Sequence, residues 1–257
     1  MATLIIFNTT LIAIITAILL VIKKHAHSER AHSLLFLISS IITIVCHYSS
    51  LIFLILTGGD ALAYVSYNPN LILPIYPCNI VMWCCLIYGV LKRKNTKFAI
   101  FLSDYIFWFG IASTLVGMFA NVDFIVNPTL RDFEVTKSIL AHATLLFNVL
   151  LIPVLGKLKP SFLRNICNIA IAVLMMYVTG LYCNLIFKAL VSTEAAYNVN
   201  SMFIIHSPFE AIPFLRYPII AAVSMIIYLI IFTVCDMINS PRGNRWFNQL
   251  AHITNKK

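Results

Sequence analysis

Long apolar stretches, separated by short polar connections, dominate the pattern of this 257-residue chain. Each of seven stretches has about 20 mainly apolar residues, the length at which an α-helix crosses the hydrocarbon core of a bilayer. The pattern predicts an all-α, polytopic membrane protein whose seven transmembrane helices form one domain over residues 1–257. The predicted spans cover residues 4–22, 34–56, 71–91, 98–120, 135–156, 166–187 and 217–237.

The composition changes the picture by excluding soluble proteins. Hydrophobic residues make up 61% of the chain and charged residues 11%, and the mean hydropathy is +0.93. A chain with so few charged residues cannot cover a soluble globule with a polar surface. The sequence therefore predicts a multi-pass protein of the cell membrane.

The basic residues predict the orientation of the bundle. Of the 18 Lys and Arg residues, four flank the predicted outer ends of the spans and fourteen flank the inner ends. By the positive-inside rule, the N-terminus lies outside and the C-terminus, with a tail at about 239–257, is cytoplasmic. Contact with anionic lipid headgroups then explains the net charge of +9, and no nucleic-acid partner is implied. The outer four are Arg131, Lys137, Lys188 and Arg216, and the inner fourteen are Lys23, Lys24, Arg30, Lys92, Arg93, Lys94, Lys97, Lys157, Lys159, Arg164, Arg242, Arg245, Lys256 and Lys257.

The first candidate for chemistry is Cys78, at the start of the third span. Pro74 and Pro77 precede it, and a proline fits only the first turn of a helix because it has no N–H to donate. The regular helix should therefore begin near Pro77 and leave Cys78 among its unpaired backbone N–H groups. Those groups and the positive end of the helix dipole favour a thiolate and stabilise an oxyanion.

His142 is the predicted partner of this cysteine. Each residue lies about seven positions, or about 10 Å, below the outer end of its own span. A cysteine with an imidazole as its base is the minimum for nucleophilic acyl chemistry, because the thiolate attacks a carbonyl and the imidazolium protonates the leaving group. The alternative is a packed thiol and a histidine bonded to a neighbouring carbonyl.

Other polar residues are candidates for binding or orienting a substrate, or for helix packing. Asn184 is placed to orient an acyl carbonyl or the histidine, although a hydrogen bond between helices is an alternative. Asp104 lies near the inner face and is assigned to helix packing or a buried polar pair. The seven cysteines show no metal-ligand or disulfide spacing, so no metal or organic cofactor is implied. The remaining candidates are His47, Asn79, Asn200 and, in the long outer connection, His206.

Several motifs occur in order along the chain: LPIYPCNI at 73–80, the turn from Gly110 to Thr114, Ala141-His142-Ala143 followed by residues 157–161, and Asn184 followed by NSMF at 200–203. Together they resemble the landmarks of the bacterial YwaF-like integral membrane proteins, whose eukaryotic member is transmembrane protein 164. The resemblance covers roughly residues 32–237. Two features depart from the family pattern, since the NSMF motif lacks preceding glycines and His47 stands where an acidic residue is expected.

The resemblance implies a cysteine-dependent acyltransferase that moves fatty acyl chains between lipids. Cys78 and His142 match the catalytic cysteine and histidine of the family, and Asp104, Asn184 and Asn200 match its polar positions. The expected partners are membrane phospholipids as acyl donors and a lipid or lipid-modified protein as acceptor, with the active site toward the extracellular leaflet. The alternative is a seven-helix receptor or small-solute transporter without catalysis. Against a retinal-binding receptor, the span at 217–237 contains no lysine.

Overall fold

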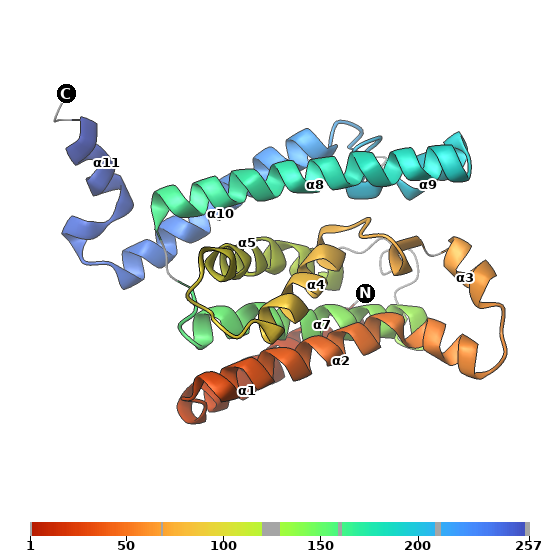
Figure 1. Cartoon of the computed structure of the whole chain (residues 1–257), viewed down its shortest axis with the longest axis horizontal. Helices are drawn as coiled ribbons and strands as arrows, with labels where there is room; N and C mark the ends of the chain where they lie inside the picture. Colours follow the sequence, from red (N-terminus) through yellow and green to blue (C-terminus); the bar gives the residue numbers. More distant parts are fainter. Residues whose placement is uncertain (1, 68, 120–128, 159–160, 209–211, 255–257) are drawn as a thin grey trace.

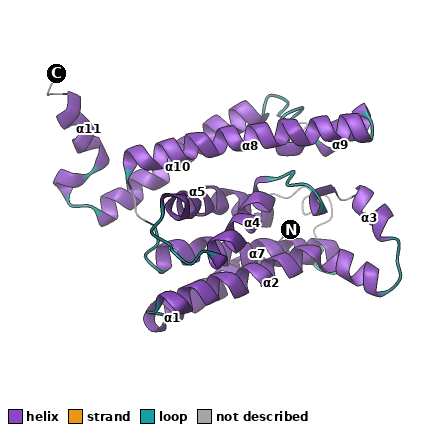
Figure 2. Cartoon of the chain, viewed as in Figure 1, coloured by secondary structure: helices purple, strands orange, loops and turns teal. Residues whose placement is uncertain are grey.

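The computed structural model describes residues 2–67, 69–119, 129–158, 161–208 and 212–254. Within these ranges every regular element is a helix (Figure 2). The longer elements are α1 (Ala2–His25), α2 (Glu29–Leu56), α4 (Pro77–Val90), α5 (Lys97–Phe119), α7 (Phe133–Val154), α8 (Phe162–Leu190) and α10 (Tyr217–Asn239). The shorter ones are α3 (Ala61–Tyr67), η1 (Pro69–Leu71), α9 (Thr193–Val199), η2 (Ser201–Phe203), η3 (Arg242–Asn244) and α11 (Trp246–Thr254).

Six of the predicted spans are helices long and apolar enough to cross a membrane, and they agree with the predicted ranges to within a few residues at each end. The span predicted at 71–91 differs. Its helix, α4, has 14 residues and is about 21 Å long, shorter than the ~30 Å hydrocarbon core. The prolines explain this, because Pro74 lies in non-helical chain and Pro77 is the first helical residue. Lys159, Lys256 and Lys257, which were counted in the basic bias, lie outside the described residues.

The helices lie in three layers (Figure 1). Helices α8, α9 and α10 form one layer, α4 and α5 lie in the middle, and α1, α2 and α7 form the other layer. Helix α5 connects the layers. It packs on α4 within the middle layer, on α7 in one outer layer and on α8 in the other. The core therefore centres on α2, α4, α5 and α7, where Phe36, Val81, Trp108 and Ile152 are almost fully buried.

A polar network joins α2 to α7 inside this core. The Ser39 hydroxyl donates to the Asn148 side-chain oxygen at 2.5 Å, and the Asn148 amide donates to the Thr43 hydroxyl at 3.0 Å. All three side chains are buried. Hydrogen bonds between membrane helices contribute about 0.6 to 2 kcal/mol each, so this network fixes the register of the two helices that carry His47 and His142.

Candidate catalytic site

Cys78 lies in the first turn of α4, and the preceding residues explain why the helix begins there. Tyr76 is the N-cap, with extended backbone (φ −123°, ψ 154°), and Pro77 takes the first helical position. The side-chain oxygen of Asn79, which was expected to orient a substrate, accepts a hydrogen bond from the Tyr76 backbone N–H at 3.1 Å. Asn79 thus fixes the helix start and leaves the partly buried Cys78 at the positive end of the dipole.

The chain just before this cysteine is attached to the outer connection between α8 and α10. The Ile75 carbonyl accepts hydrogen bonds from the Met202 N–H at 2.9 Å and the Ser201 hydroxyl at 3.1 Å. Asn184 of α8 holds Ser201 in turn, since its side-chain oxygen accepts from the Ser201 N–H at 2.8 Å and its amide donates to the Ser201 carbonyl at 3.3 Å. Asn184 therefore positions the approach to Cys78 through Ser201.

Asn200 organises the loop that makes these contacts. Its side-chain oxygen accepts from the backbone N–H groups of Ile205 at 3.0 Å and His206 at 3.2 Å, and its amide donates to the His206 carbonyl at 2.9 Å. Asn200, Met202 and Phe203 have φ values of +43°, +54° and +56°, a region that non-glycine residues rarely adopt. The surrounding structure must hold such strained backbone in place, and strain of this kind concentrates at functional sites.

Helix α8 accepts this loop at Gly180. A Cβ atom at Gly180 would lie 2.8 Å from the Met202 Cβ and 2.6 Å from the Ile204 side chain. Any larger residue would therefore push η2 away from α8, and with it the hydrogen bonds to Ile75.

His142 of α7 lies against α5, and its hydrogen bond defines its chemistry. Its Nδ1 lies 2.8 Å from the Ser138 carbonyl oxygen. A carbonyl can only accept, so Nδ1 carries the proton and the neutral ring keeps a lone pair on Nε2. The ring packs on Gly117, where a Cβ would lie 2.2 Å from Nε2. His142 therefore has the tautomer that a general base requires at Nε2.

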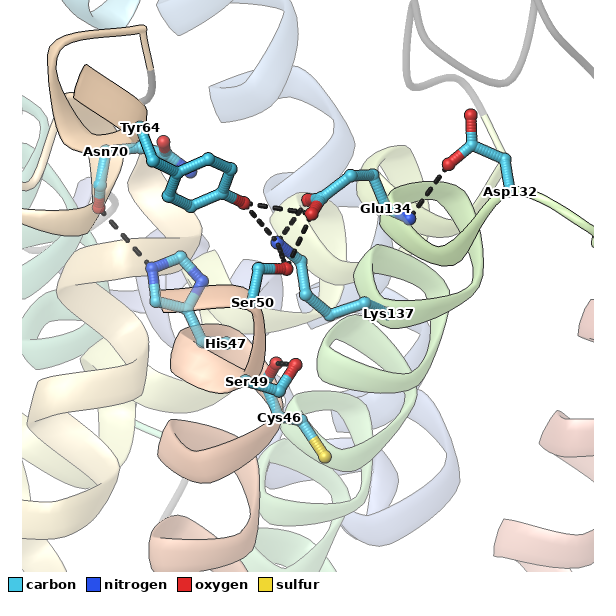
Figure 3. Close-up of polar contacts among 9 residues, drawn as sticks. All are labelled: Cys46, His47, Ser49, Ser50, Tyr64, Asn70, Asp132, Glu134 and Lys137. Carbon is cyan, nitrogen blue, oxygen red and sulfur yellow. Dashed lines mark hydrogen bonds and ion pairs between the residues drawn. The ribbon is translucent and has the colours of Figure 1, made fainter. Parts of the chain in front are cut away.

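His47 of α2 contacts the segment that precedes α4. Its Nε2 lies 3.4 Å from the Asn70 carbonyl oxygen (Figure 3). That His47 and His142 share a cavity stays a prediction.

Four side chains above His47 form an outer polar cluster: Ser50, Tyr64, Glu134 and Lys137 (Figure 3). One Glu134 oxygen accepts from the Ser50 hydroxyl at 2.6 Å and from the Tyr64 hydroxyl at 2.9 Å. The Lys137 ammonium donates to Ser50 at 2.9 Å and to Tyr64 at 3.3 Å, and it forms an ion pair with Glu134. The outer polar cluster joins α2, α3 and α7.

The sequence did not predict the outer polar cluster. The spacing of Glu134 and Lys137, three residues apart at the start of a helix, is a visible signal for an ion pair on one face. Ser50 and Tyr64 carry no comparable signal because they come from other elements, 84 and 70 residues from Glu134.

Cys78 and His142 lie on helices α4 and α7, which contact each other. Among the described residues no hydrogen bond joins the thiol to the imidazole, whose Nδ1 contacts the Ser138 carbonyl. The candidates therefore fall into two groups: Cys78 with its supports Asn79, Asn184 and Asn200, and the two histidines, of which His47 contacts the Asn70 carbonyl and His142 the Ser138 carbonyl. Catalysis by the pair stays a prediction.

Comparison with known proteins supports the resemblance inferred from the motifs. No curated protein and no solved structure matches the chain. A family model does match it, over residues 1–236, which include every candidate residue of both groups. With its several apolar helices, this protein is a multi-pass membrane protein that belongs to the TMEM164 family.

Proposed function

We propose that this protein is a membrane-embedded acyltransferase that moves a fatty acyl chain from a phospholipid to a second lipid or a lipid-modified protein. The observation that carries the proposal is the position of Cys78 at the second helical residue of α4. The first turn of a helix has backbone N–H groups with no partner four residues earlier, and such groups stabilise both a thiolate and the oxyanion of an acyl-transfer intermediate. The hydrogen bond of His142 supports the proposal, since a ring that donates from Nδ1 to the Ser138 carbonyl has its lone pair on Nε2 when it is neutral.

The first half-reaction would form a thioester on Cys78. His142 Nε2 takes the thiol proton, and the sulfur attacks the ester carbonyl carbon of the phospholipid. The S–C bond forms and the ester C–O bond breaks, while the imidazolium returns its proton to the departing glycerol oxygen. The products are the acyl-enzyme and a lysophospholipid.

The second half-reaction would reverse these roles with a new acceptor. His142 removes a proton from the acceptor hydroxyl or amine, which attacks the thioester carbonyl and releases the Cys78 thiol. Water must be excluded during the lifetime of the thioester, because hydrolysis would waste the acyl chain. The partly buried position of Cys78 against the apolar core supports this exclusion.

The proposed orientation places the site toward the extracellular leaflet of the cell membrane. It requires that α4 act as a seventh span, that the N-terminus lie outside and that the C-terminus be cytoplasmic. The bias in Lys and Arg supports it. No nucleic acid takes part.

The test is to trap the acyl-enzyme. Purified full-length protein incubated with a phospholipid carrying a radiolabelled acyl chain should acquire label that neutral hydroxylamine removes, because hydroxylamine cleaves thioesters. Cys78→Ala should abolish the label. Cys167→Ser is the matched control, since Cys167 is an exposed thiol and its loss should leave the label unchanged. Label that persists in Cys78→Ala would contradict the proposal.

Labelling from each side of the membrane tests the orientation. Leu62 of α3 is 82% exposed, so Leu62→Cys in a Cys167→Ser background should react with a membrane-impermeant maleimide added outside intact cells. An epitope at the C-terminus should become accessible only after permeabilisation. The opposite pattern would invert the bundle and move the site to the inner leaflet.

A further inference from the structure

An apolar groove lies between α8 and α10, far from Cys78 and His142. Its volume is about 190 Å³, and Ile169, Met225, Leu229 and Phe232 are among the side chains that line it. It begins at the first turn of α8, where Asn165 forms part of its wall. It is smaller than the pockets of about 300 Å³ or more that enclose whole drug-sized ligands, so it suits a segment of one long chain.

Arg164 precedes Asn165 of the groove wall in the sequence, and a buried carboxylate fixes its orientation. The Nε atom of Arg164 lies 3.2 Å from an Asp104 oxygen, which also accepts from the Asn168 amide at 2.7 Å. Asp104 is 1% exposed, whereas the Arg164 side chain is 33% exposed. This is the buried polar pair expected for Asp104 from the sequence. Only Nε is used, and neither terminal nitrogen of the guanidinium is hydrogen-bonded within the described part of the chain.

Three buried donors without partners belong to the groove wall or to residues next to it, and the Oδ1 atom of Asp104 also lacks a partner among the described residues. The Nη2 atom of Arg164, the Nδ2 atom of Asn165 and the Nε1 atom of Trp108 are all buried, and none has a hydrogen-bond partner among the described residues. The Trp108 ring packs on Tyr228 and Phe232, which both line the groove. Buried donors without partners are costly, and the guanidinium fork matches the geometry of a phosphate.

We propose that this groove binds an anionic phospholipid. The end of one acyl chain lies between α8 and α10, and phosphate oxygens accept hydrogen bonds from the terminal nitrogens of Arg164 and from the Asn165 amide. The start of α8 adds the positive end of its dipole. Asp104 neutralises part of the Arg164 charge but uses only Nε, so its role is to position the guanidinium.

This site is separate from the proposed catalytic site. Asp104 and Gly117 lie on the same helix, and their separation of 13 positions corresponds to about 20 Å. Gly117 contacts His142, whereas Asp104 contacts Arg164. The inference therefore does not depend on acyl transfer and can be tested by binding alone.

Native mass spectrometry of the full-length protein in detergent tests the proposal. Dioleoylphosphatidylglycerol is added at increasing concentration, with dioleoylphosphatidylcholine as the uncharged comparison. Leu229→Trp should fill the groove, and Asn165→Asp should keep the oxygen that accepts from the Ser161 N–H while replacing the donor by a negative charge. Each should weaken binding of the anionic lipid by about 10-fold or more. Asn165→Asp removes a hydrogen bond to a charged group, and Leu229→Trp occupies the space of the acyl chain.

Ile171→Trp is the matched control, because Ile171 is on α8, is 50% exposed and is not in the groove wall; it should bind as the wild type does. Arg164→Gln should also weaken binding, but it leaves Asp104 without its cation. If Arg164→Gln fails to fold for this reason, Leu229→Trp still tests the proposal. Inorganic phosphate should not compete. Wild-type affinity in Leu229→Trp and Asn165→Asp, or equal binding of the two lipids, would overturn the proposal.

Discussion

Cys78→Ser is expected to reduce acyl transfer by at least ~100-fold while the protein stays folded, because a serine hydroxyl has a far higher pKa than a thiol at a helix N-terminus. The substitution changes the volume little, so the free energy of unfolding should fall by about 1 kcal/mol or less. Transfer of a labelled acyl chain in reconstituted vesicles measures the first effect, and the melting temperature measures the second.

His142→Ala should be inactive to a similar degree. The double variant should be scarcely worse than either single variant, because a nucleophile and its base act as one unit. Full transfer activity in Cys78→Ser at an unchanged melting temperature would assign Cys78 to packing and leave the function open.

Gly117→Ala should reduce transfer by about 100-fold as well, although residue 117 itself takes no part in the chemistry. The new Cβ would lie 2.1 Å from Cδ2 and 2.2 Å from Nε2 of His142, so the ring must move and its bond to the Ser138 carbonyl must stretch or break. A displacement of about 1 Å in a catalytic group is enough for a loss of this size. The extra methyl group should also cost about 1 to 3 kcal/mol of stability.

Gly243→Ala is the matched control, because nothing lies within 4 Å of a Cβ at that position. It should transfer acyl chains at the wild-type rate. If Gly117→Ala did the same, the observed setting of His142 would not matter for the reaction.

The sequence predicted those parts of the fold that depend on local properties. Six long helices follow from the length of the apolar stretches, and the start of α4 at Pro77 follows from the missing proline N–H. The same start makes α4 short, because the span predicted at 71–91 ends within one residue of the observed helix and loses its first six residues to the chain before Pro77.

The candidate site was predicted as residues and not as an arrangement. The link from Asn184 through Ser201 to Ile75 needs three separate segments to meet. The left-handed backbone at Met202 has no sequence signal, because the residue is not a glycine. Tyr64 reaches Glu134 only because α3 folds back over the start of α7, and such a contact depends on tertiary structure.

The shortness of α4 has a consequence for the surrounding lipid. A helix of about 21 Å in a hydrocarbon core of about 30 Å leaves a hydrophobic mismatch of about 9 Å. Extended chain cannot fill that gap in contact with lipid, because its carbonyls would lack partners. At Ile75 the partners are supplied by Ser201 and Met202, so the outer connection, instead of lipid, contacts this carbonyl. With α4 as the proposed seventh span, lipid that contacts this helix directly should be thinned, which would bring its ester carbonyls closer to Cys78.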